Sequence, residues 1–215
     1  MSYYKKAAEI LTKVFTASRL DTEVTPDMVE LLMKEQELEK ERSPRIMNKI
    51  KEFLQEAGYE CDREKIIEGS NKKEVVLSGR IKTIVSAMYN LLAPKNGRYQ
   101  DLNDMIGMMI ICEDKATCYD IYKLILEKFK ENGDTFISEK DLIKEPKKNG
   151  YQSIHVHIVD SEGFVFEVQI KSYKMFAFSQ TGDCKHELYK KRLETSMLKE
   201  DEWIIFDSLR EEYWF

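Results

Sequence analysis

The sequence predicts an α+β fold, in which helices flank a mixed β-sheet of about five strands. Three observations support this prediction. The segments near both ends carry helical signals, residues 105–112 form a continuous apolar run of strand length, and residues 153–158 and 164–171 alternate polar with apolar side chains. The predicted elements follow one another as helix, strand, helix, strand, helix, hairpin and helix, an order typical of α+β domains.

The first 57 residues are predicted to be helical. Thr25 is an N-cap residue followed by Pro26 at the first helical position, and Ser43 and Pro44 repeat this pair. We therefore expect one helix to begin after Thr25 and another to begin after Ser43. The latter helix is expected to end at Gly58.

The middle of the chain is predicted to alternate strands with helices. Residues 75–77 form a short strand, and a helix is expected from about Thr83 to Leu92. The apolar run 105–112 is typical of a central strand. Residues 115–132 place apolar side chains at core spacing along an amphipathic helix.

The two alternating segments are predicted to pair as a hairpin with one polar face. The residues between them, Asp-Ser-Glu-Gly at 160–163, have the chemistry of a turn. Alternation places on the polar face Ser153, His155 and His157 of the first strand and Glu167, Gln169 and Lys171 of the second. These residue types bind phosphates, bases and metal ions, although a polar sheet face can also simply be solvated.

Residues 172–215 are expected to be mostly helical and end in the aromatic residues Tyr213, Trp214 and Phe215. Such an end docks on its own core more often than on a partner. The 215 residues are enough for one domain with a substantial core. We expect N-terminal helices in 1–57, a sheet-containing core in 58–171 and C-terminal helices in 172–215.

Composition narrows the classes of function. Hydrophobic residues make up 42% of the chain and charged residues 34%, and the longest apolar runs are too short to span a membrane. No signal peptide is evident, so a cytoplasmic protein is expected. The four cysteines have no metal-ligand spacing and are expected to be reduced. A net charge of −5 argues against broad nucleic-acid binding but leaves room for a local basic patch.

Three polar residues outside the hairpin lie where a strand begins or ends. Arg80 and Lys82 lie where a strand passes into a helix, whose N-terminus favours phosphates. They could equally be solvated surface cations. Asp104 stands immediately before the buried run, where a carboxylate is costly without a partner such as Mg²⁺. A turn-forming role for Asp104 is the alternative.

Two motifs lie in and around the hairpin: the loop Pro-Lys-x-Asn-Gly-Tyr-x-Ser-x-His at 146–155 and Glu-x-Gln-Ile-Lys at 167–171. In both motifs the chain resembles the synthetase domain of RelA/SpoT-type alarmone synthetases. Segments 78–86, 104–107 and 182–189 agree in order and spacing. The resemblance implies a nucleotidyltransferase-like synthetase fold that moves pyrophosphate from ATP to the 3′-hydroxyl of GDP or GTP.

The resemblance also implies roles for individual residues on the ATP side. Arg80, Lys82 and Ser86 match positions that hold ATP. Asp104 and Glu167 match the acidic positions that bind Mg²⁺ and lie near the attacking hydroxyl. Burial would raise the pKa of Glu167 toward that of a useful base and Mg²⁺ would lower it, so its role as metal ligand, base or both stays open.

On the acceptor side, Tyr151 matches the residue that stacks on the acceptor base, with a plain core aromatic as the alternative. The residues expected to contact the acceptor's phosphates and sugar are Lys147, Asn149, His155 and Gln169. His186 also falls on a family position, although a lone helical histidine is as often structural.

Three positions depart from the family pattern. Met109 and Asn90 stand where the family usually has basic residues, and Lys171 replaces the usual arginine. One lost charge-assisted contact is worth about 1.5–3 kcal/mol, so two would weaken the nucleotide site considerably. The cations that could compensate are Lys95, Arg98 and Lys144.

Other functions remain open within the same resemblance. One is a toxin-like enzyme that modifies an adenine nucleotide or the 3′ end of tRNA and is neutralised by an antitoxin. Another is a non-catalytic nucleotide-binding module. A homo-oligomer is a further expectation. The family's hydrolase centre is not expected, because the chain's three histidines all lie after residue 150.

Overall fold

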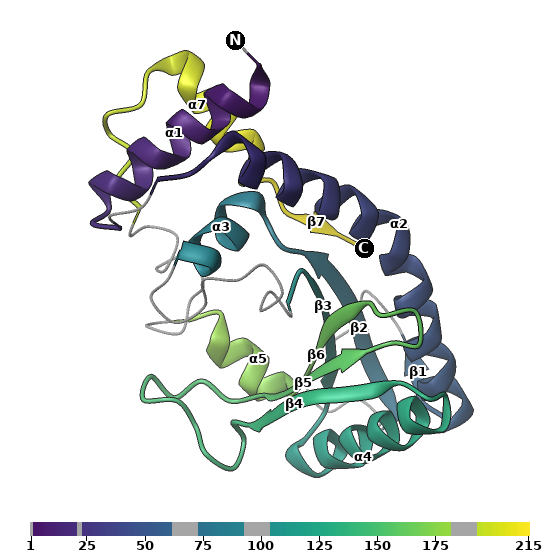
Figure 1. The fold of residues 1–215 in the computed structure, drawn as a ribbon. Helices are drawn as coiled ribbons and strands as arrows, with labels where there is room; N and C mark the ends of the chain where they lie inside the picture. Colours follow the sequence, from purple (N-terminus) through teal and green to yellow (C-terminus); the bar gives the residue numbers. More distant parts are fainter. Residues whose placement is uncertain (1, 21–22, 62–72, 93–103, 182–192) are drawn as a thin grey trace.

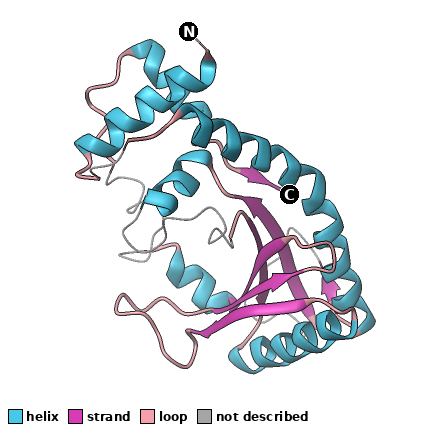
Figure 2. Cartoon of the chain, viewed as in Figure 1, coloured by secondary structure: helices cyan, strands magenta, loops and turns pink. Residues whose placement is uncertain are grey.

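The computed structural model describes residues 2–20, 23–61, 73–92, 104–181 and 193–215. Its helices are α1 (Tyr3–Ala17), α2 (Pro26–Glu56), α3 (Ile84–Leu92), α4 (Lys115–Glu131), α5 (Tyr173–Ser179) and α7 (Glu200–Ser208). Its strands are β1 (Glu60–Cys61), β2 (Glu74–Ile81), β3 (Ile106–Cys112), β4 (Thr135–Asp141), β5 (Ile154–Val159), β6 (Val165–Ser172) and β7 (Tyr213–Trp214). The predicted α+β class is confirmed, with helices around one sheet (Figures 1 and 2).

The sheet is mixed, as predicted. Within the described residues its order is β1-β2-β3-β6-β5-β4, and β7 pairs with β2. β3 and β6 run parallel, and β5 and β6 form the predicted antiparallel hairpin. The described strands number seven instead of about five, because β1 and β7 are two-residue strands and β4 is a polar edge strand without a clear apolar pattern.

One face of the sheet is buried beneath α2 and α4, which lie together along it in Figure 1. Ile106, Val156 and Phe166 from three strands belong to this core, and Phe53 and Phe129 contribute from the two helices. The rings of Phe53 and Phe129 meet edge to face at 5.2 Å between centroids. Burying each large apolar side chain contributes about 1.5–3 kcal/mol, so this core fixes which face of the sheet remains polar.

A second apolar core lies at the other end of the molecule. It is formed by α1, the first half of α2, α3 and α7, with Phe15, Leu32, Met88 and Phe206 fully or almost fully buried. Figure 1 shows α1 and α7 side by side at this end. Because α3 belongs to this core and β2 to the first, the connection from β2 to α3 lies where the two cores meet.

The predicted helix start at Ser43 is wrong, because α2 continues without a break from Pro26 to Glu56 and Pro44 lies inside it. Proline has no backbone N–H, so the carbonyl of Lys40 loses its helical donor. The hydroxyl of the buried Ser43 donates to that carbonyl at 3.3 Å. The Ser-Pro pair therefore repairs a helix interior here instead of starting a new helix.

The end of α2 was predicted correctly. Gly58 has φ +79°, and the backbone N–H groups of Gly58 and Tyr59 donate to Gln55 and Leu54, each at 2.9 Å. A left-handed glycine with such bonds closes the last turn of a helix. None of the described helices is both long and apolar enough to cross a membrane.

The last residues form a strand instead of the helix that was expected to reach residue 214. β7 pairs antiparallel with β2, and Phe215 exchanges two backbone hydrogen bonds with Gly79 at 2.9 and 3.0 Å. A Cβ atom at Gly79 would lie 2.3 Å from the Phe215 ring, so only glycine fits beneath it. Phe215 packs against the first core, as the docking prediction requires, while Tyr213 and Trp214 are about half exposed.

Candidate active site

The polar face of the sheet gathers side chains from four neighbouring strands. Arg80, Gly107, Glu167 and His157 stand in register on β2, β3, β6 and β5. A Cβ atom at Gly107 would lie 3.6 Å from the side chain of Arg80 and 4.0 Å from Oε2 of Glu167. The missing side chain at Gly107 therefore lets Arg80 and Glu167 approach each other across β3.

Glu167 is a buried carboxylate with both oxygens engaged. Its Oε1 lies 2.6 Å from Nδ1 of His155 and 3.5 Å from Nε2 of His157, and its Oε2 accepts from Nε2 of Gln169 at 2.5 Å. Burial alone would raise the pKa of Glu167, but the hydrogen bonds from these three side chains hold the pKa well below its usual range. Glu167 is therefore ionised at neutral pH and is a weak base.

Tyr151 lies at the centre of a hydrogen-bond network. Its hydroxyl is 3.1 Å from Nε2 of His155, donates to Oε1 of Gln169 at 3.3 Å and accepts from Nζ of Lys171 at 3.3 Å. His155 and Gln169 are also the residues that bind Glu167. The network thus connects Tyr151 to the carboxylate through two different side chains.

The loop that carries Tyr151 folds back through a tight turn. The N–H of Gly150 donates to the carbonyl of Lys147 at 2.8 Å, and Oδ1 of Asn149 accepts from the N–H of Tyr151 at 3.2 Å. Gly150 has φ +80°, and a Cβ atom there would lie 3.1 Å from the ring of Phe178 on α5. Nζ of Lys147 lies 5.0 Å from the centre of the Tyr151 ring. Asn149 thus shapes the turn, and Lys147 lies beside the ring.

A second group lies where the two cores meet. The ammonium of Lys82 and the carboxylate of Asp104 form a partly buried ion pair. Thr83 fixes the start of α3 by accepting from the N–H of Ser86 at 3.0 Å and donating to its hydroxyl at 2.8 Å. Within the described residues, no hydrogen bond or ion pair joins this group to Glu167.

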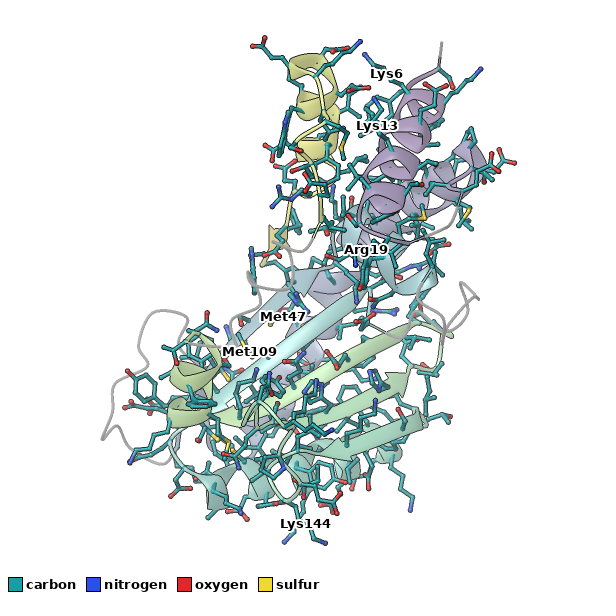
Figure 3. All side chains as sticks on the ribbon, turned by 90° about the vertical axis from the view of Figure 1, so that its left-hand side faces the viewer. Lys6, Lys13, Arg19, Met47, Met109 and Lys144 are labelled. Carbon is teal, nitrogen blue, oxygen red and sulfur yellow. The ribbon has the colours of Figure 1, made fainter. Side chains whose placement is uncertain are left out.

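The structure places the departures from the family pattern as follows. Met109 lies on the polar face in register with Ser78 and Gln169, so an apolar side chain separates two polar ones there. Asn90 lies on α3. Lys144 points outward at the edge of the molecule, away from Met109, in Figure 3 and does not replace the missing charge. The other residues, Lys95, Arg98 and His186, lie outside the described residues.

The donor set of this face suits a hard cation. Mg²⁺ is usually held by one or two carboxylates, and its other ligands are waters and substrate phosphates. Glu167 is ionised, and Asp104 is a charged partner of Lys82. Each carboxylate is therefore an oxygen donor of the kind that Mg²⁺ takes, and waters and nucleotide phosphates would supply its other ligands.

Sequence reasoning gave no role to two residues that are central here. Lys171 donates to Tyr151 and Gln169, and His157 lies beside Glu167 and 2.9 Å from the hydroxyl of Ser138. The period-two alternation had placed both residues on the polar face. That signal was sufficient to include them among the candidates.

Comparisons with known proteins agree with this picture. The model of the region found in RelA / SpoT proteins matches residues 79–194. The bifunctional (p)ppGpp synthase/hydrolase SpoT of Escherichia coli is 31% identical over 157 residues, which are 73% of this chain and 20% of that protein. A probable GTP pyrophosphokinase of Mycobacterium leprae is 30% identical over 122 residues, 57% of this chain and 15% of that protein. The chain thus spans about a fifth or less of these curated relatives.

A solved structure supports the fold independently. The small alarmone synthetase 2 of Bacillus subtilis aligns with a TM-score of 0.56 and 20% identity over 83% of this chain and 90% of that one. At this identity the likeness concerns the fold alone. The predicted synthetase fold is confirmed by it.

Proposed function

The chain belongs to the RelA/SpoT family, and from this premise we propose that it is a pyrophosphokinase that transfers the β,γ-pyrophosphate of ATP to the 3′-hydroxyl of GDP or GTP. The observation that carries the proposal is that the side chains of Arg80 and Glu167 both border the space over Gly107. A cation for phosphates and a carboxylate for a hydroxyl lie side by side there, next to an aromatic residue suited to a base.

Each side chain has a role in this proposal. Arg80 and Lys82 neutralise the ATP phosphates at the start of α3, near which Ser86 lies. Tyr151 stacks on the acceptor base, and Lys147, Asn149, His155 and Gln169 surround the rest of the acceptor. Asp104 and Glu167 would hold Mg²⁺, which neutralises triphosphate charge and orients the phosphates when it is bound.

The low pKa of Glu167 indicates how the hydroxyl is activated. Phosphoryl-type transfer passes through a loose transition state and relies mainly on positioning and electrostatics, so a strong base is not required. Glu167 accepts the hydrogen bond of the 3′-hydroxyl and orients its oxygen toward the β-phosphorus. As the new P–O bond forms, the bond between the β-phosphorus and the bridging oxygen to the α-phosphate breaks, AMP leaves, and the hydroxyl proton passes late to Glu167.

The surface around the acceptor loop supports a small-nucleotide acceptor. Lys140, Lys144, Lys147 and Lys148 are exposed there, but Asp141 and Glu145 are interleaved with them. Binding to tRNA would call for a continuous basic strip, because phosphate contacts dominate such binding. Within the described residues, this loop has mixed charge instead.

The test follows label from [γ-³²P]ATP in the presence of Mg²⁺. GDP, GTP, ATP alone and deacylated tRNA are offered separately, and AMP is quantified alongside. We expect label to move to GDP or GTP with one AMP formed per transfer. Label that moves only to tRNA or to an adenine nucleotide would assign the chain to the toxin-like alternative, and no transfer to any acceptor would contradict a pyrophosphokinase.

A variant ties the activity to this site. Glu167→Gln should lower the transfer rate about 100-fold or more, because a preorganised charge is lost where the hydroxyl reacts. Glu127→Gln, an exposed position on α4, is the matched control and should leave the rate unchanged. Wild-type transfer by Glu167→Gln, with an unchanged circular dichroism spectrum, would remove Glu167 from the mechanism.

A further inference from the structure

Two cysteines lie against each other on the apolar side of the sheet, opposite the polar face that carries Glu167. Cys112 is the last residue of β3, and Cys118 lies in the first turn of α4. Both belong to the first core, and Cys112 is 2% exposed and Cys118 0%. Their sulfur atoms are 3.3 Å apart. The core thus contains a dithiol that joins a central strand to the helix covering it.

The turn between β3 and α4 holds this pair together. Oδ1 of Asp114 caps α4 by accepting from the backbone N–H and from the hydroxyl of Thr117, each at 2.8 Å. The backbone N–H of Cys118 donates to the carbonyl of Asp114 at 3.1 Å. Because these bonds fix the start of α4 close to the end of β3, they also fix the two thiols beside each other.

The arrangement is close to that of a disulfide. A disulfide bond is about 2.0 Å long, so the sulfur atoms would approach by about 1.3 Å, a distance that small side-chain rotations supply. The thiol of Cys112 also donates to the carbonyls of Asp114 and Lys171, at 3.6 and 3.7 Å. A thiol is a weak donor, so losing its hydrogen in a disulfide costs little.

We propose that Cys112 and Cys118 form a reversible intramolecular disulfide, with a hydroperoxide as oxidant, and that this bond ties α4 to β3 without rearranging the fold. The oxidant transfers one oxygen to the sulfur of Cys118: an S–O bond forms, the O–O bond breaks, and the thiol proton leaves with the second oxygen as water or alcohol. The sulfur of Cys112 then attacks that of Cys118, the S–O bond breaks, and the hydroxide takes the proton of Cys112 and leaves as water. Two thiols thereby lose two electrons and two protons, and a small-molecule thiol reverses the reaction by exchange. No nucleotide takes part, so this inference is independent of the proposed function.

The start of α4 is the route by which an oxidant reaches this buried pair. Helix ends open locally at a much smaller free-energy cost than the whole fold. Lys115 and Ala116, the first two residues of α4, are exposed, so opening this turn uncovers Cys118. While the turn is closed, the hydrogen bond with Cys118 and burial raise the pKa of Cys112 well above its usual range, and Cys112 stays a neutral thiol. Oxidation is therefore slow, and closing of the turn returns the oxidised Cys118 to Cys112.

The test maps the disulfide in the wild type. Trypsin cuts after Lys115, between the two cysteines, and releases peptides 99–115 and 116–123. The folded protein is treated with hydrogen peroxide at pH 7, free thiols are blocked with iodoacetamide in urea, and the monomer band of a non-reducing gel is digested for mass spectrometry. We expect the two peptides to be joined to each other and to separate after treatment with dithiothreitol.

Thermal unfolding gives a second readout with matched controls. The variant Cys61→Ser/Cys184→Ser keeps this pair as its only thiols, and adding Cys112→Ser or Cys118→Ser to it leaves a single thiol. A bond that closes this short loop without strain should raise the Tm of the two-thiol protein by about 4–8 °C after peroxide treatment. Both single-thiol proteins should show no increase. Amide hydrogen exchange in the first turn of α4 should slow in the oxidised two-thiol protein alone.

Three results would overturn the proposal. Separate, alkylated peptides after peroxide treatment would show that the pair is a packing contact of reduced thiols. Sulfinic or sulfonic acid on Cys118 in place of the bond would show that Cys112 does not reach the oxidised sulfur. Joined peptides with a lowered Tm would show that the bond strains the fold. If a serine variant does not fold, the peptide map and the Tm of the wild type still decide among these outcomes.

Discussion

Replacing Tyr151 by phenylalanine separates two roles of this residue. If stacking on a base were its whole contribution, Tyr151→Phe would behave like the wild type and Tyr151→Ala would not. In the structure the hydroxyl also has His155, Gln169 and Lys171 as partners, at 3.1, 3.3 and 3.3 Å. We therefore expect Tyr151→Phe to be impaired, although it keeps the ring.

The magnitude follows from the partners that are left behind. Removing one partner from a buried polar group costs about 1–3 kcal/mol. Lys171 is the most buried of the three and would keep only Gln169 as a hydrogen-bond partner among the described residues. This range corresponds to about a 5- to 150-fold loss in affinity for the acceptor or in kcat/KM.

The assay measures kcat and KM for each acceptor with Tyr151→Phe, Tyr151→Ala and a control. Tyr122→Phe is a suitable control, because it also removes a hydrogen-bonded tyrosine hydroxyl, here one that donates to the carboxylate of Glu139. Tyr122 lies on α4, which covers the apolar face of the sheet. Tyr151→Phe should fall between the wild type and Tyr151→Ala. Kinetic constants of Tyr151→Phe within about twofold of the wild type would show that the hydroxyl network does not contribute, and our reasoning would be refuted.

Three further predictions concern stability. Burial lowers the pKa of Lys171 in the folded protein to about 8, below its ordinary value of 10.5. Between these two pH values the folded protein binds fewer protons than the unfolded chain, so the free energy of unfolding increases by about 3 kcal/mol from pH 8 to 10.5. Urea unfolding should therefore show that Lys171→Met is more stable than the wild type at pH 7 and equally stable at pH 10.5. Burial raises the folded pKa of Glu39 to about 7 from 4.5, so stability present below pH 4.5 is lost as pH rises to 7. Glu39→Gln should therefore stabilise by about 1–2 kcal/mol at pH 8, less than the full shift because solvent screens the charge and the ion pair with Arg42 is lost. The gain should be small at pH 4, and equal gains at both pH values would contradict the assignment. Gly79→Ala should lower the free energy of unfolding by about 1–3 kcal/mol, because the new methyl group displaces the Phe215 ring. In thermal unfolding, the double variant Gly79→Ala/Phe215→Ala should be no less stable than Phe215→Ala alone.

Much of this site could be predicted from residue spacing. A period of two places His155 and His157 on one face of β5 and Glu167 and Gln169 on one face of β6. The register of the hairpin then pairs His155 with Gln169 and His157 with Glu167. Spacing therefore indicated that these residues share one face of the hairpin, and the observed register decides which of them are neighbours.

Other features depend on contacts that spacing does not encode. The hydroxyl of Tyr151 reaches Lys171 only because the acceptor loop folds back over the strands, and the loop conformation relies on the positive φ of Gly150. The Ser43-Pro44 pair has the same local signature inside a helix as at a helix start. Packing of α2 against the sheet and the hydrogen bond from Ser43 decide between the two.

The two edges of the sheet bear on how the protein can associate with other chains. The outer edge of β2 is covered at one end by β1 and at the other by β7. On the far side, β4 is interrupted by a bulge between Phe136 and Ser138 and carries the exposed charges of Glu139 and Lys140. Among the strands that the structure describes, neither edge offers a long, straight row of unpaired backbone groups, which is the template for adding a foreign strand. Sheet extension between copies, the route to domain swapping and fibrils, is thereby disfavoured.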